Sequence, residues 1–188
     1  MWTAKKTEKE VESLVPQVVE KITTAVERLI NQGAVYVVVL GNPPRGCSPI
    51  ILTLFMSPNR SDYDGLGCLR NVNSVSKHHN TMLRAALDGL RGKYPHTKII
   101  FANLYQPIIQ VLQDPVHFAS SRLVAATVAG TTRTIAPSVA GSAVACEDPS
   151  ASVHWDGGHY TESINRYIAK GWLYGSYADP PILTAICY

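Results

Sequence analysis

Asp156 and His159, three positions apart, are the two residues of this sequence best suited to chemistry. They flank Gly157 and Gly158, which predict a turn that runs into a helix. On such a turn the carboxylate can accept a hydrogen bond from one imidazole nitrogen and leave the other nitrogen facing outward. That arrangement supplies the orienting acid and the general base of a nucleophilic triad. A helix-capping aspartate beside a surface histidine has the same spacing, so the spacing alone leaves both interpretations open.

A metal site is another interpretation of this segment, because His154, Asp156 and His159 are all potential ligands within six positions. No distant fourth ligand stands out, however, and Trp155 crowds the segment. No Cys/His cluster elsewhere in the sequence has the spacing of a zinc site. We therefore predict neither a metal nor a cofactor.

A nucleophile for this pair is not evident in the sequence. The Gly-x-Ser-x-Gly pattern of the α/β-hydrolase elbow does not occur. Ser48 follows a predicted strand and a Gly-rich turn, but Pro49 argues against a helix N-terminus with oxyanion donors there, so we interpret Ser48 as structural. Cys47 could act as a thiol nucleophile, although a disulfide with Cys68 is its favoured use.

Four cysteines, at positions 47, 68, 146 and 187, permit three full pairings. Cys47 and Cys68 flank a loop rich in Pro, Gly and Asn, and they are the candidate pair for a disulfide. Four reduced thiols in a cytosolic protein remain the alternative at this point.

Hydrophobic periodicity predicts the elements that must position these residues. Apolar residues recur at helical spacing over residues 11–30, and Pro16 predicts that this helix starts or kinks there. Residues 34–40 and 98–104 are short apolar runs typical of strands buried on both faces of a parallel sheet. A helix over residues 71–92 joins them, which predicts a parallel βαβ unit.

The remaining segments are less regular. We expect a long irregular connection over residues 41–70, a short helix over 105–118 and a loop over 119–145. A last helix is expected over 161–174 with Thr161 as its cap, followed by an extended tail. Two strands cannot bury both faces of a sheet, so the architecture looks incomplete.

Composition sets the broad class of this protein. The chain has 188 residues, 46% hydrophobic and 16% charged, which favours one globular domain over residues 1–188. The net charge is +3 and the basic residues are scattered, so no nucleic-acid partner is predicted. No apolar run reaches the roughly 18 residues of a membrane span. The first twelve residues carry charges where a signal peptide would be apolar.

Four stretches together resemble the plant GDSL esterase/lipase family, a branch of the SGNH hydrolases. They lie, in the family's order, at residues 14–34, 37–53, 63–108 and 146–183. The last contains the WDG-x-H-x-T-E pattern, and the resemblance implies that Asp156 orients the base and His159 takes the proton of a serine. It also implies a flavodoxin-like α/β fold, a three-layer αβα sandwich around a parallel sheet. Members cleave carboxylic esters of small molecules without a metal and are usually secreted.

The departures from the family pattern are equally informative. The family's GDS motif with the nucleophile and the two blocks with the oxyanion-hole glycine and asparagine are expected before residue 1. We therefore expect residues 1–188 to form a single partial domain that lacks its first strands and is inactive alone. The alternative is an inactive truncated paralogue that binds a partner or has no function. Residues 119–145 also lack the family's cysteines, which leaves Cys146 without its expected partner.

Overall fold

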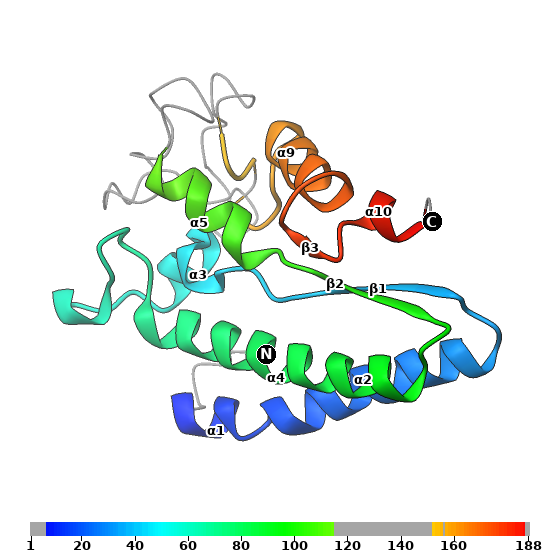
Figure 1. Cartoon of the computed structure of the whole chain (residues 1–188). Coiled ribbons are helices and arrows are strands. Elements are labelled where there is room, and N and C mark those ends of the chain that lie inside the picture. The colour runs from blue at the N-terminus through cyan, green and yellow to red at the C-terminus, as the bar shows by residue number, and fades with distance from the viewer. Residues whose placement is uncertain (1–6, 115–151, 156, 187–188) are drawn as a thin grey trace. The chain divides into compact units, whose positions relative to one another are not determined.

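The computed structural model describes residues 7–114, 152–155 and 157–186 of the chain. The described residues are drawn from two compact units (Figure 1). The first unit comprises Met1–Pro43, Ser74–Gln106 and Ala169–Tyr188, and the second comprises Pro44–Asn73 and Pro107–Ile168. The predicted loop at 119–145, Cys146, Cys187 and Asp156 lie outside the described residues.

The N-terminal apolar run forms two helices, α1 (Glu8–Glu12) and α2 (Val15–Asn31). Thr7 caps α1 in a capping box, in which its hydroxyl accepts from the amide of Glu10 and its own amide donates to the Glu10 carboxylate. Pro16 lies in the first turn of α2, where its missing amide hydrogen leaves no intrahelical bond unmade. Of the two predicted alternatives, a start or a kink at Pro16, the first is confirmed, because α2 begins at Val15.

The sheet of the first unit contains β1 (Tyr36–Leu40), β2 (Lys98–Ala102) and β3 (Ala178–Asp179), in the order β1-β2-β3. β1 and β2 are parallel, and α4 (Arg70–Lys93) lies between them in the chain. The predicted parallel βαβ unit is therefore confirmed, and the described part of the chain has an α/β arrangement. β3 pairs antiparallel with β2, so the sheet is mixed.

Both faces of β2 are covered. On one face Ile99 and Phe101 pack in a core with residues of β1 and of the helices α1, α2 and α4, which lie along this side of the sheet in Figure 1. The buried members of this core are Val11, Val15, Val19, Val26, Val37, Val39, Val75, Leu83, Leu87, Leu90, Ile99 and Phe101. On the other face Ile100 packs with Ala178, and with Ala185 of α10 (Ile182–Ile186). The tail was expected to be extended, and this short helix corrects that prediction.

β1 is covered on one face only. Val37 and Val39 are buried against the helices, whereas the exposed fractions of Tyr36, Val38 and Leu40 are 45%, 43% and 49%. The prediction that this strand is buried on both faces is therefore wrong for the residues that the structure describes. The sequence run is apolar throughout, but the side chains on its second face stay about half exposed in the described structure.

The connection after β1 is more structured than predicted. It contains the short 3₁₀ helices η1 (Arg45–Cys47) and η2 (Arg60–Asp62), and between them α3 (Pro49–Leu54). The inference that Pro49 argues against a helix start is wrong, because proline suits the first helical position, where an amide hydrogen has no partner. Further along lie α5 (Tyr105–Gln113) and α9 (Glu162–Leu173), close to their predicted ranges. No described helix is long and apolar enough to cross a membrane.

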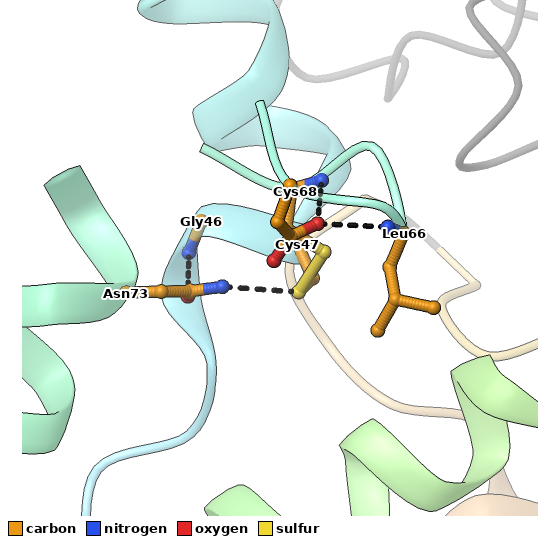
Figure 2. Close-up of a disulfide and its surroundings, with 6 residues drawn as sticks. Gly46, Cys47, Leu66, Cys68 and Asn73 are labelled. Carbon is orange, nitrogen blue, oxygen red and sulfur yellow. Dashed lines mark hydrogen bonds between the residues drawn. A yellow bond between two sulfur atoms is a disulfide. The ribbon is translucent and has the colours of Figure 1, made fainter. Parts of the chain in front are cut away.

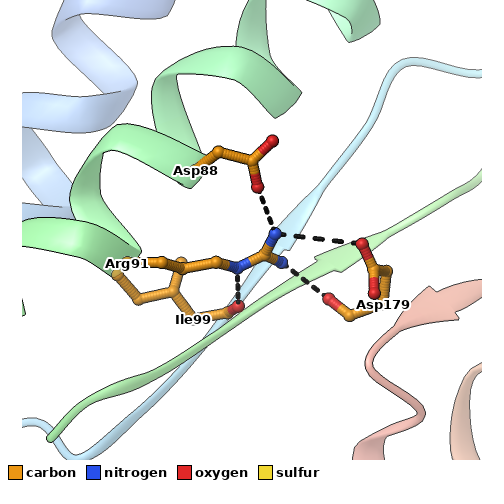
Figure 3. Close-up of polar contacts among 4 residues, drawn as sticks. All are labelled: Asp88, Arg91, Ile99 and Asp179. Atoms are coloured by element: carbon orange, nitrogen blue, oxygen red, sulfur yellow. Dashed lines mark hydrogen bonds and ion pairs between the residues drawn. The ribbon is translucent and has the colours of Figure 1, made fainter. Parts of the chain in front are cut away.

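Arg91, near the end of α4, ties this helix to the sheet (Figure 3). Its Nε donates to the Ile99 carbonyl at 2.8 Å and its Nη2 donates to the Asp179 carbonyl at 2.7 Å. The same guanidinium forms an ion pair with Asp88 at 2.6 Å. One side chain therefore joins α4, β2 and β3.

Replacing Arg91 by methionine is expected to lower the free energy of unfolding by about 1–3 kcal/mol, because two strand carbonyls lose a charged donor. The exposed ion pair with Asp88 contributes little to this loss. Urea denaturation followed by circular dichroism measures the change. Arg28→Met, on an exposed position of α2, is the matched control and should leave the midpoint within experimental error. Equal midpoints for the two variants would contradict the assigned role of Arg91.

Candidate functional site

Gly157, Gly158 and His159 lie at the tip of a closed loop, whose described residues, 152–155 and 157–161, we name the His159 loop. The amide of Trp155 donates to the His159 carbonyl at 3.1 Å, and the amide of Thr161 donates to the Val153 carbonyl at 3.0 Å. Asp156 lies outside the described residues, so its role as orienting acid stays a prediction. The two backbone bonds hold the stems of the loop together on either side of the glycines.

Thr161 connects this loop to α9, as its position directly before the helix predicts. Its hydroxyl donates to the Ser152 carbonyl at the other end of the loop, and its carbonyl accepts from the Asn165 amide in the first turn of the helix. The loop is therefore fastened to the start of α9, and His159 is two residues from that fastening.

Near the tip of the loop, His154 and Tyr160 lie on one side and Trp155 and His159 on the other. His154 and Tyr160 form an antiparallel bridge, and their ring centroids are 4.8 Å apart. Trp155 and His159 are both exposed, with ring centroids 6.2 Å apart and planes inclined by 29°. Since side chains of neighbouring residues in paired strands point to opposite faces, His154 and His159 do not face a common point. The imidazole of His159 is thus presented to solvent beside an exposed indole.

Tyr160, on the more buried side of the loop, does not ionise in the physiological pH range. Burial raises the pKa of the Tyr160 phenol well above its ordinary value, and the nearby positive charge of Arg45 opposes this shift only in part. The phenol therefore stays neutral throughout the physiological pH range. Among the residues that the structure describes, no group of three His, Cys, Asp or Glu side chains is arranged to hold a metal ion.

The tip of the loop rests on a segment far away in the sequence. The carbonyl of Gly157 accepts hydrogen bonds from the Ile50 amide at 3.1 Å and from the Ser48 hydroxyl at 3.3 Å. Gly157 is buried and has a φ of 85°, a left-handed conformation that favours glycine. The hydroxyl of Ser48 bonds a backbone carbonyl, which agrees with the structural interpretation of this serine. No sequence pattern indicated that Ser48 and Gly157 would meet.

The residues just before Ser48 are held in place by several bonds. Cys47 and Cys68 form a disulfide, and both are buried (Figure 2). The Gly46 amide donates to the side-chain oxygen of Asn73 at 2.9 Å, and the Gly46 carbonyl accepts from the Leu69 amide at 2.9 Å. A Cβ atom on Gly46 would lie 2.3 Å from the Leu69 carbonyl oxygen, so only glycine fits this position.

Comparison with known proteins places this chain in a family. The model of the GDSL-like lipase/acylhydrolase family matches residues 2–172. Two GDSL esterase/lipases of Arabidopsis thaliana are 40% and 39% identical to the chain, each over 178 residues. A sinapine esterase of Brassica napus is 34% identical over 177 residues.

These alignments cover 91–92% of this chain but only 45–46% of each relative. The chain therefore spans less than half the length of the curated relatives that it matches. The family match includes His159 and the segment of Ser48. The resemblance inferred from the four sequence stretches is thereby confirmed, and this chain belongs to the GDSL-like lipase/acylhydrolase family.

Proposed function

We propose that Asp156 and His159 supply the acid and the base of a Ser-His-Asp ester hydrolase, whose nucleophilic serine lies outside the 188 residues. The substrate is a carboxylic ester of a small molecule. The observation that carries the proposal is the exposed imidazole of His159 on a loop closed by backbone bonds, in a chain that matches an esterase family.

In the proposed reaction His159 accepts the proton of the serine hydroxyl as its oxygen attacks the ester carbonyl carbon. The imidazolium then gives this proton to the leaving alcohol, and an acyl-enzyme remains. His159 next takes a proton from water, whose oxygen attacks the acyl group, and the proton returns to the serine oxygen as the acid is released. Asp156 holds the ring and stabilises the imidazolium. No step requires a metal or another cofactor.

The geometry of the His159 loop supports this role. The bond from the Trp155 amide to the His159 carbonyl closes the loop at the residue that carries the imidazole and so restricts the backbone there. The indole of Trp155 flanks the imidazole and offers an apolar surface to a substrate group. The disulfide between Cys47 and Cys68 supports an oxidising compartment, which suits a secreted protein.

The 188-residue chain alone is expected to hydrolyse p-nitrophenyl acetate no faster than an equal concentration of free imidazole, because the base has no serine to activate. His159→Ala should therefore leave the rate near that background. Turnover well above background that disappears in His159→Ala would contradict the location of the nucleophile. Activity that disappears on adding EDTA would instead contradict a mechanism without a metal.

A further inference from the structure

The Gly157 carbonyl joins two segments of the second unit that are far apart in the chain. Ser48 and Gly157 are separated by 109 positions, and their hydrogen bond is made within the same compact unit. A second donor, the Ile50 amide, reaches the same carbonyl from the first turn of α3. Two donors from one short segment thus fix the position of one backbone oxygen at the tip of the His159 loop.

The segment that carries the two donors can support the loop because the residues before Ser48 are themselves held by a disulfide and by hydrogen bonds. Cys47, the neighbour of Ser48, forms a disulfide with Cys68. Its Sγ also accepts a hydrogen bond from the side-chain Nδ2 of Asn73 at 3.5 Å. The Gly46 amide donates to the side chain of Asn73 in the first turn of α4 (Figure 2), and the Gly46 carbonyl accepts from the amide of Leu69, the residue before α4. Ser48 therefore begins a segment whose preceding residues have little freedom to move.

The Gly157 carbonyl lies close enough along the chain to His159 that a displacement of this carbonyl would also move His159. Only Gly158 separates Gly157 from His159, and the carbonyl of His159 closes the loop by accepting from the Trp155 amide. A rotation of the Gly157 peptide would change the direction of the chain at the tip, and the imidazole would turn with it. The left-handed φ of Gly157 belongs to this one arrangement of the tip.

We infer that Ser48 is a positioning residue of the esterase site: with the Ile50 amide, its hydroxyl holds the Gly157 carbonyl and so fixes the direction of the His159 imidazole. The catalytic meaning of this inference rests on the proposed function, whereas the support of the loop does not. Ser48 thus acts through the loop backbone and not as a nucleophile.

The test uses the complete 188-residue chain and requires no catalysis. Amide hydrogen exchange of Trp155 reports the opening of the loop, since this amide donates to the His159 carbonyl. The nuclear Overhauser effect between the Trp155 indole and the His159 imidazole reports the placement of the side chain itself. Both are measured well below the unfolding temperature, so that global unfolding does not contribute.

Ser48→Ala is expected to speed exchange at the Trp155 amide about fivefold, the factor that corresponds to one neutral hydrogen bond, and to weaken the ring-to-ring signal. Ser48→Thr keeps a hydroxyl and should restore both signals. Ser57→Ala is the matched control, because the Ser57 hydroxyl bonds Asp62 within the same segment and not the His159 loop. It should leave both signals unchanged.

The inference is overturned if Ser48→Ala leaves the exchange rate and the ring-to-ring signal at their wild-type values. It is also overturned if Ser48→Thr behaves as Ser48→Ala, because then the hydroxyl is not the supporting group. Neither readout depends on ester hydrolysis. A failure of the proposed function would therefore appear in the activity of His159 variants, and a failure of this inference would appear in the exchange and ring signals.

Discussion

His159→Ala is expected to lower kcat/KM for p-nitrophenyl acetate by about 10⁴-fold in a catalytically complete protein, in line with the loss of a triad base. A complete protein can be made by joining the unmatched part of the Arabidopsis thaliana relative with 40% identity ahead of residue 1 of this chain. On the proposed function, the segment from the relative supplies the nucleophile of this chimera and this chain supplies His159. Most of the loss should fall on kcat, because the base acts in the transition state and not in substrate binding.

His78→Ala is the control for this chimera, since His78 is an exposed histidine of α4 in the first unit. It should retain the activity of the parent chimera. If His159→Ala retained more than about a tenth of that activity, His159 would not be the general base. A folded chimera that was inert with His159 intact would favour the alternative, an inactive paralogue that binds a partner.

The second large effect concerns the disulfide. Replacing Cys47 and Cys68 together by serine is expected to lower the free energy of unfolding by about 3 kcal/mol, the chain-entropy value for a closed loop of this size. The disulfide closes a loop between residues 21 positions apart. Both cysteines are buried, so the hydroxyl groups of the introduced serines would lose their hydrogen bonds to water, which adds to the loss of stability. Guanidinium denaturation measures the difference.

Chemical reduction gives the matched control for this prediction. Dithiothreitol should move the midpoint of the wild-type chain toward that of the double serine variant and should leave the variant itself unchanged. If the oxidised and reduced wild-type chains unfolded at the same denaturant concentration, the bond would not stabilise the fold. Because Ser48 follows Cys47, the double variant should also loosen the His159 loop and speed exchange at the Trp155 amide.

The elements that depend on local pattern were predictable from the sequence. The 3.6-residue period of α2 and α4 and the apolar runs of β1 and β2 each encode their own structure, and their order predicts parallel pairing. β3 spans only two residues and exists because it pairs with Phe101 and Ala102 of β2. Such an element is set by tertiary contact, and a sequence window of that length carries no signal for it.

The exposed face of β1 shows another limit. The run of β-branched residues predicts a strand, but it cannot tell whether another element covers each face. Val37 and Val39 pack against the helices of the first unit, whereas Tyr36, Val38 and Leu40 stay about half exposed. The burial of an apolar strand depends on which other elements pack against it, and the sequence of the strand does not specify those elements.

The candidate site also has one part that was predictable from local sequence and one that was not. The turn that carries His159 was predictable, because two adjacent glycines shortly before a helical pattern are a local signal. The support of that turn by Ser48 was not predictable, because it joins positions 109 residues apart through a backbone carbonyl, which any residue type would present. The start of α3 at Pro49 was misjudged for a local reason, the tolerance of proline at the first helical position.

The location of the covalent adduct in the active chimera tests the central claim most directly. A fluorophosphonate reacts with an activated serine, whose oxygen bonds phosphorus as fluoride leaves, and mass spectrometry of the digested protein identifies the serine. We predict that the adduct forms on a serine of the joined segment, on none within residues 1–188, and that His159→Ala abolishes its formation. An adduct on Ser48 or on another serine of this chain, or labelling that persists in His159→Ala, would contradict the account.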